Sequence, residues 1–259
     1  MSDTAEVRSI HPTPIMNLRI AFLCAALTLP VAAEPPYSGT IFIDPDIITS
    51  ADPTTYLSVT PKGRGVREMF DRRKNAFIKV NARLFSARFS DSRVIEVQVN
   101  PEFASSKAKR LAVKYAKVIG RLPKCLRVDV DTVWIHAGLQ PFGGGNRNLL
   151  IHTGQSALYE RDGILEETMV HEASHTSLDD DHAMAKGWLA AQKSDPDFIS
   201  TYARDYPTRE DVAETFLLWL AVRHRAERID PAVATTIRNT IPARLRYFDK
   251  FRFDISPVK

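Results

Sequence analysis

Strand-like patterns occur only in the first part of this 259-residue chain, together with one helix-like pattern. One helical pattern runs over 105–119, where apolar residues recur three and four positions apart until Gly120 and Pro123 end the run. From Asp162 onward only helical patterns occur. The strand-like segments, where apolar and polar residues alternate, are 76–89, 94–99, 126–137 and 148–152. Strands with one helix, followed by helices alone, predict a single α+β domain.

Composition places the chain among ordinary globular proteins and identifies no function. The chain is 44% hydrophobic and 25% charged, with a formal net charge of +4. Its basic residues form no block of five or six like charges, so we expect neither a nucleic-acid-binding arm nor a membrane-binding arm.

The N-terminal segment has the order of features found in a secretory signal peptide. Arg19 precedes an apolar run over 20–33 that ends in Val31-Ala32-Ala33. This run is shorter than the about 20 apolar residues that a membrane-spanning helix needs. We therefore expect cleavage after Ala33, a secreted or periplasmic protein, and no stable membrane insertion after cleavage. Met16 is an alternative start of translation.

Three segments make up the expected organisation. A signal peptide over 1–33 is followed by an irregular, Pro-rich N-terminal segment over 34–62 and by a single domain over 63–259. The alternative for the first segment, a buried N-terminal helix, is disfavoured by Pro30. Cleavage would leave Cys125 as the one cysteine of the mature chain, so we expect no intramolecular disulfide.

The helical half contains His171-Glu172-Ala173-Ser174-His175, an H-E-x-x-H pattern. Residues four apart on a helix are separated by about 40° around the axis and about 6 Å along it. Both imidazoles can therefore bind one Zn²⁺. Glu172 lies where it can act as general base toward a water at the metal. The pattern predicts one zinc ion per chain, and the alternative is a surface helix with two unrelated histidines.

A catalytic zinc site needs a third protein ligand and an open fourth position. Asp181 lies ten residues after His171, which is the spacing of the third ligand in metzincin-like enzymes, and His182 follows it. Those enzymes also have a glycine three residues after the second histidine, where the chain turns back. This chain has Leu178 there, so the spacing alone does not decide for Asp181.

Another candidate ligand lies near the start of a predicted helix over 208–220. Thr208 is a suitable N-cap, and Asp211 follows it three residues later. Glu210 and Glu214 are four residues apart on one face, where two carboxylates repel unless a cation lies between them or one bonds a ligand histidine. Glu210 is therefore another candidate third ligand, and its alternative role is a surface acid that complements the helix dipole.

These motifs together resemble a known family. In chain order, His171-Glu172-x-x-His175, Tyr202 and Glu210-x-x-Ala213-Glu214-x-Phe216 are similar to the gluzincin metallopeptidases, closest to the catalytic domain of anthrax lethal factor and its relatives. The resemblance covers about 145–251. It implies a zincin-like fold: a small twisted mixed sheet with a backing helix, then a helical half with the motif helix, a second ligand-bearing helix and a final amphipathic helix over 231–251.

The resemblance also implies roles for single residues. The residues that it assigns are the zinc ligands His171, His175 and Glu210, the general base Glu172, the oxyanion donor Tyr202, and Glu214, which would orient a ligand histidine. Asp181 and His182 stay as alternative third ligands. Tyr206 is the alternative to Tyr202, because the gap between tyrosine and glutamate is one residue longer here than in the family.

We therefore expect an exported zinc-dependent metallopeptidase. It would hydrolyse peptide bonds of a protein or peptide substrate with a zinc-activated water and Glu172 as the base. The alternative is a non-catalytic binding protein on a zincin scaffold, with a structural zinc. A binding scaffold has no need for Glu172, which favours the enzyme.

Overall fold

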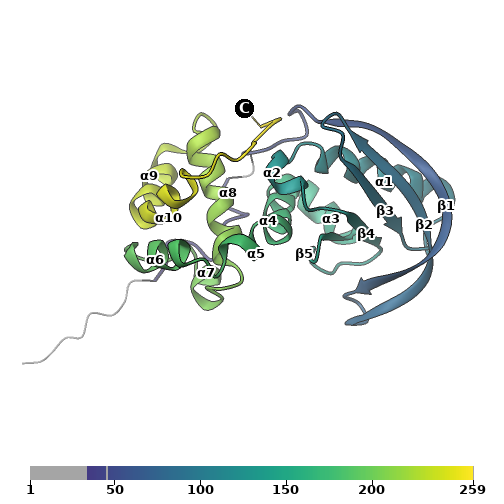
Figure 1. Cartoon of the computed structure of the whole chain (residues 1–259), viewed down its shortest axis with the longest axis horizontal. Helices are drawn as coiled ribbons and strands as arrows, with labels where there is room; N and C mark the ends of the chain where they lie inside the picture. The colour runs from purple at the N-terminus through teal and green to yellow at the C-terminus, as the bar shows by residue number, and fades with distance from the viewer. Residues whose placement is uncertain (1–33, 45, 259) are drawn as a thin grey trace, which may run out of the picture. The chain divides into compact units, whose positions relative to one another are not determined.

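The computed structural model describes residues 34–44 and 46–258, which contain a six-stranded mixed sheet and ten helices (Figure 1). The signal peptide predicted for 1–33 lies outside the described residues. The strands are β1 (Tyr56–Asp71), β2 (Ala76–Phe89), β3 (Val94–Val99), β4 (Thr132–His136), β5 (Gly143–Gly145) and β6 (Asn148–His152). The predicted α+β class is confirmed.

The helices alternate with strands only in the first half of the described chain. They are α1 (Ser105–Ile119), α2 (Lys124–Arg127), α3 (Thr153–Arg161), α4 (Leu165–Ser177), α5 (Asp179–His182), α6 (Lys186–Ser194), α7 (Thr201–Asp205), α8 (Asp211–His224), α9 (Pro231–Thr240) and α10 (Pro242–Phe248). No helix of residues 34–44 and 46–258 is long and apolar enough to cross a membrane.

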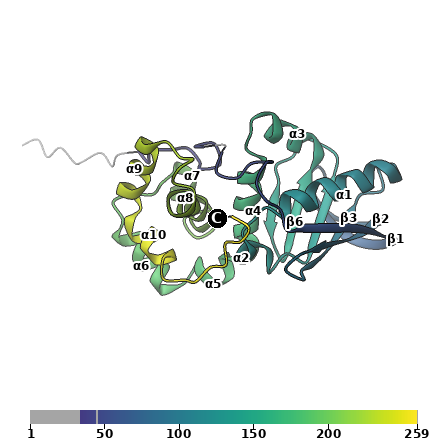
Figure 2. The ribbon, with the colours of Figure 1, turned by 90° about the horizontal axis from the view of Figure 1, so that it is seen from above.

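The strands follow the order β1-β2-β3-β4-β6-β5 across the sheet. β3, β4 and β6 are parallel, whereas β1, β2 and the short edge strand β5 pair antiparallel with their neighbours. Helix α1 lies along one face (Figure 2). Tyr115 on α1 and Phe85, Val97 and Val133 on the sheet are all buried in the same core. Burial of these apolar side chains fixes the strand register, because a shift by one residue would expose them.

Four predicted elements have the limits that the sequence indicated, namely β2, β3, β6 and α1. The predicted irregular segment 34–62 was wrong at its end, since β1 begins at Tyr56. β1 contains Pro61 and Gly63, which disrupt a strand pattern, but its register shifts between these two residues. An edge strand tolerates both residues at such a bulge, because its outer side needs no partner.

Other predicted boundaries also differ from the structure. The strand predicted over 126–137 is only Thr132–His136, because Pro123 begins the short helix α2 instead. The helical half begins with α4 at Leu165, because Asp162 ends α3 and pairs with Arg161. The helix predicted over 231–251 is two helices, because Pro242 has no N–H to continue α9 and begins α10.

Helices α4 and α8 pack side by side and form the centre of the helical half (Figure 1). α8 is buried along most of its length, from Asp211 to Val222. At its first turn, Asp211 accepts a hydrogen bond of 2.7 Å from Arg244 on α10, and neither side chain is exposed. Arg244 also pairs with buried Asp195 at 3.1 Å, so this buried network joins the start of α8 to α10.

Glu167 is a buried carboxyl group on the side of α4 that faces the N-terminal segment. Its Oε1 accepts a hydrogen bond of 2.9 Å from the backbone N–H of Ile48, and Oε2 has no hydrogen-bond partner among the described residues. Burial raises the pKa of Glu167 to about 9, although the Ile48 N–H lowers it. The folded protein therefore carries this group protonated at neutral pH.

We predict that Glu167→Gln makes the protein less sensitive to rising pH. The folded group binds a proton up to pH about 9 and the unfolded group only up to about 4.5, so folding stability falls as pH rises through this window. Glutamine keeps the acceptor for Ile48 and carries no charge. At pH 8 the variant should be more stable than the wild type by on the order of 2 kcal/mol in urea unfolding, with the difference closing toward pH 4.

A matched control is Glu160→Gln, which changes an exposed carboxylate paired with Lys114. This control should alter stability by less than about 0.5 kcal/mol at either pH. If the difference in unfolding free energy between Glu167→Gln and the wild type does not change with pH, Glu167 is not protonated in the folded protein as assigned.

Candidate metal centre

Helices α4 and α8 bring three potential metal-binding side chains to one point. His171 and His175 lie one turn apart on α4, and Glu210 is the N-cap residue of α8. His175 Nε2 lies 3.2 Å from His171 Nε2 and 3.1 Å from Glu210 Oε2. The third side of the triangle, from His171 Nε2 to Glu210 Oε2, is 3.4 Å. All three side chains are largely buried.

This triangle has the dimensions of a zinc-binding set. Ligand atoms at tetrahedral positions, 2.0–2.1 Å from a central zinc ion, lie about 3.3 Å from one another. Two imidazole nitrogens and one carboxylate oxygen are also a usual donor set for zinc. Both the spacing and the chemistry of these residues therefore fit a zinc ion.

The electrostatic surroundings favour a positive charge at the same point. Burial lowers the pKa of His175, but hydrogen bonds to Asp179 and Glu210 outweigh it and raise the pKa to about 10. Burial opposes ionisation of Glu210, yet its hydrogen bonds to His171 and His175 hold its pKa well below the usual range. The neighbouring carboxylates therefore favour a cation at this point, either a proton on His175 or a metal ion.

Two further carboxylates contact the outer nitrogens of the histidines. Asp179 Oδ2 lies 2.8 Å from His175 Nδ1, and Glu214 Oε1 lies 3.4 Å from His171 Nδ1. Glu214 is itself fixed by a hydrogen bond of 2.6 Å from the hydroxyl of Ser200. A carboxylate on the second ring nitrogen orients an imidazole and leaves Nε2 free to bind a metal.

The other oxygen of Glu210 is also occupied. Arg209 Nε donates a hydrogen bond of 2.8 Å to Glu210 Oε1, which leaves Oε2 for the histidines. The guanidinium of Arg209 stacks on the ring of Tyr206, with 4.9 Å between the guanidinium carbon and the ring centre. Arg209 therefore fixes how Glu210 presents its carboxylate.

A cavity of about 450 Å³ opens onto the three donors. Glu172 and Tyr202 both line it, and Tyr206 does not. Burial and then the neighbouring Glu210 raise the pKa of Tyr202 to about 12, so its phenol stays protonated and can donate a hydrogen bond. Tyr206 instead packs against Tyr202, with ring centres 5.4 Å apart, and is about half exposed.

The short edge strand β5 forms another wall of this cavity. A Cβ atom at Gly144 would lie 1.7 Å from the carbonyl oxygen of Glu172, so only glycine allows this approach of the strand to α4. The hydroxyl of Thr176 accepts a hydrogen bond from the N–H of Gly145 and donates one to the carbonyl of Asn148. Helix α4 is thus attached directly to the edge of the sheet.

The structure does not bring the other two candidate ligands to the histidine pair. His182 Nδ1 is 2.8 Å from the hydroxyl of Tyr247, and its ring is buried beside Phe251. Asp181 is exposed and lines a neighbouring cavity. Both lie on α5, which follows α4 after Leu178 alone, so the chain does not make the turn that a glycine at this position provides in metzincin-like enzymes.

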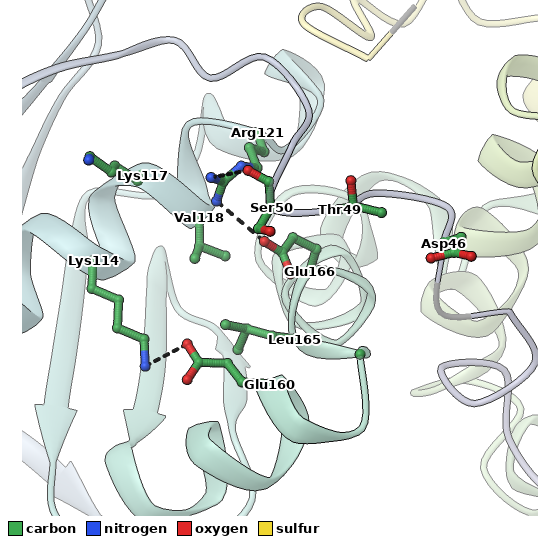
Figure 3. Close-up of a pocket in the computed structure, with 11 residues that line it drawn as sticks. Asp46, Thr49, Ser50, Lys114, Lys117, Val118, Arg121, Glu160, Leu165 and Glu166 are labelled. Carbon is green, nitrogen blue, oxygen red and sulfur yellow. Dashed lines mark hydrogen bonds and ion pairs between the residues drawn. The ribbon is translucent and has the colours of Figure 1, made fainter.

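A larger cavity, of about 510 Å³, lies between α1, α3, α4 and the N-terminal segment. Four of its charged residues form two ion pairs: Lys114 pairs with Glu160 at 2.6 Å, and Arg121 pairs with Glu166 at 3.3 Å (Figure 3). It contains neither the histidines nor Glu172. We therefore take the smaller cavity as the candidate functional site.

Comparisons with protein-family models, with curated proteins and with solved structures found no match. The site is therefore interpreted from its own residues.

Sequence reasoning overlooked Asp179, Arg209 and Arg72 as parts of this site. Asp179 follows His175 by four residues, so the helical spacing that paired the two histidines could have indicated it. Arg209 is adjacent to Glu210 in sequence, but nothing in the pattern shows which oxygen it binds. Arg72 lines the same cavity from the turn between β1 and β2, about 100 residues away in sequence.

We predict that Glu210→Ala abolishes zinc binding at this site and that Asp181→Ala does not. The first variant removes one of three converging donors, whereas the second changes an exposed residue outside the triangle. Zinc content of the purified proteins, measured by plasma mass spectrometry after dialysis, should be one per chain in the wild type and Asp181→Ala. Loss of zinc only in Asp181→Ala would overturn the assignment of Glu210.

Proposed function

We propose that this protein is a zinc-dependent peptidase with His171, His175 and Glu210 as the metal ligands. One observation carries the proposal. The three donor atoms are spaced 3.1–3.4 Å apart, and they open onto a cavity that a general-base candidate, Glu172, also lines. A metal site with a purely structural role has its ligand positions closed by protein groups. Here the three donors lie at an open cavity.

A zinc ion bound there would polarise a peptide carbonyl and promote ionisation of a water molecule. Glu172 lines the cavity beside the histidines and makes no side-chain hydrogen bond among the described residues. Its carboxylate is therefore available to accept a proton from a water that attacks the carbonyl carbon. The same carboxyl group then donates that proton to the amide nitrogen as the C–N bond breaks.

Tyr202 supplies a hydrogen-bond donor in the wall of the same cavity. It lines the cavity from α7, and its phenol is protonated throughout the neutral range. A donor in this place stabilises the negative charge that develops on the carbonyl oxygen. Ser200 supports the same region, because it caps α7 and also binds Glu214.

The arrangement of elements supports a zincin-like fold as part of this proposal. β5 is an antiparallel edge strand next to the motif helix α4, and α8 carries the third ligand at its N-terminus. The resemblance to gluzincin peptidases rests on the same motifs. We extend the proposal to an exported protein, on the sequence features of residues 1–33 alone.

We predict that Glu172→Gln keeps one zinc per chain and loses hydrolysis. The substitution removes the proton acceptor and leaves all three donors in place, so the rate of peptide cleavage should fall at least about 100-fold. Cleavage is measured by mass spectrometry on a peptide library, and zinc by plasma mass spectrometry. Glu166→Gln is the control, since Glu166 lies on the same helix beside Arg121, outside this cavity.

Two outcomes contradict the proposal. Cleavage by Glu172→Gln at the wild-type rate would exclude its role as the base. A wild-type protein that holds one zinc and cleaves no peptide would favour the non-catalytic binding protein.

We predict that Tyr202→Phe and Tyr206→Phe have different effects. Loss of the Tyr202 hydroxyl should lower kcat by on the order of 100-fold, with KM and zinc content nearly unchanged. The ring of Tyr206 lies against Tyr202 and Arg209, and Tyr206 does not line the cavity. The kcat of Tyr206→Phe should therefore stay within about threefold of the wild-type value. Equal losses in both variants would contradict the assignment of Tyr202.

A further inference from the structure

Arg72 is a cation in the wall of the cavity that no group of the described chain neutralises. Its side chain lines the cavity together with Gly144 and Glu172. A Cβ atom added to Gly143 would lie 2.8 Å from Arg72 Nη2, so the guanidinium packs directly on β5. Among residues 34–44 and 46–258, the side chain of Arg72 has no ion-pair or hydrogen-bond partner, and only its backbone carbonyl accepts a hydrogen bond, from Asn75.

The turn that carries Arg72 is held rigidly by its neighbours. Buried Asp71 accepts hydrogen bonds from the backbone N–H and the guanidinium of Arg73. Arg73 also donates to Glu102, and the other oxygen of Glu102 accepts the N–H of Ala137, just after β4. This chain of contacts ties the tip of the hairpin to the sheet, so the backbone at Arg72 is held in place before a ligand arrives.

The other charged groups at the cavity already have roles. Arg209 is bound to Glu210, and Asp179 is bound to His175. Glu172 is the proposed base. Arg72 is therefore the cation of this cavity that is available to a bound molecule, and it lies on the β5 side of the metal ligands.

The β1–β2 hairpin extends this positive charge away from the cavity. Residues 56–89 contain nine Lys or Arg against two Asp or Glu, an excess larger than the net charge of +4 of the whole chain. The basic residues are spread along two strands, so they form no contiguous block in the sequence. β1 is the edge strand of the sheet, and β2 pairs with it along its length (Figure 1). A hairpin with this charge attracts an acidic chain toward the cavity.

We propose that Arg72 binds a carboxylate of the substrate, and that the substrates are acidic polypeptides; this inference rests on the proposed peptidase function. A guanidinium pairs with a carboxylate through two parallel hydrogen bonds, which fixes the position of that carboxylate relative to the bond that is cleaved. The carboxylate is that of an Asp or Glu side chain or of the C-terminus of the substrate. The hairpin charge favours an acidic segment.

The test is a digest of a proteome-derived peptide library, with cleavage sites identified by mass spectrometry. The wild type should show Asp or Glu enriched at one fixed position from the cleaved bond by about 10- to 100-fold, the range for a charged hydrogen-bonded pair. Arg72→Gln should lose this enrichment, and Arg72→Glu should replace it with Lys or Arg. Lys74→Gln is the matched control, because Lys74 is an exposed cation in the same turn that does not line the cavity.

Amidation of the peptides separates the two sources of the carboxylate. If the Arg72-dependent preference persists when the peptide C-termini are amidated, the carboxylate is that of an Asp or Glu side chain. If the preference disappears, the carboxylate is that of the C-terminus. Both results support the proposal. Cleavage without a carboxylate preference, or a preference that persists in Arg72→Gln, overturns it. Zinc content and thermal unfolding equal to those of the wild type show that the variants are folded.

A binding measurement separates this inference from the peptidase function. Zinc-loaded Glu172→Gln is mixed with fluorescein-labelled peptides that differ only in central Glu or Gln residues, and anisotropy is recorded. Tighter binding of the Glu peptide that depends on Arg72 supports the inference even if the wild type cleaves nothing. Equal binding of both peptides, or tighter binding of a labelled single-stranded oligonucleotide than of the Glu peptide, overturns it.

Discussion

The convergence of two imidazoles and a carboxylate on one buried point is the constraint on which the rest of the structure depends. Burying such groups together is costly unless a cation or a shared proton offsets their charge. The fold holds them there with fixed contacts: Asp179 and Glu214 at the outer ring nitrogens, and Arg209 at the outer oxygen of Glu210. Helices α4 and α8, which are both buried along most of their lengths, supply these residues or directly adjoin them.

The sequence predicted the class of the fold and much of its sheet. Elements with a plain alternation or helical period, such as Val94–Val99 and Ser105–Ile119, were predicted with their exact limits. β1 was not, because its Pro61 and Gly63 are read as strand breakers although a bulge on an edge strand accommodates them. The strand predicted over 126–137 was too long, because Val128 and Val130, in the loop between α2 and β4, continue the alternation of β4.

Residues of the candidate site could be predicted from the sequence where they lie close together in the chain, and not where long-range packing brings them together. His171, Glu172 and His175 belong to one helical turn, and helical geometry alone places the two imidazoles together. Spacing along the chain could not decide between Glu210, Asp181 and His182 as the third ligand. The choice of Glu210 depends on the packing of α8 on α4. The position of Arg72 at the cavity could not be predicted, since it depends on the register of a hairpin and on the close approach of β5 to the turn. Long-range packing of this kind has no signature in a single sequence.

Anomalous diffraction at the zinc absorption edge, from crystals of the zinc-loaded protein, tests the central claim most directly. The account predicts one strong anomalous peak enclosed by His171 Nε2, His175 Nε2 and Glu210 Oε2, with each atom about 2.0–2.2 Å from the peak. It also predicts that the fourth side of the metal faces the cavity lined by Glu172. A peak held by Asp181 or His182, or a fourth protein ligand that closes the cavity side, would contradict it.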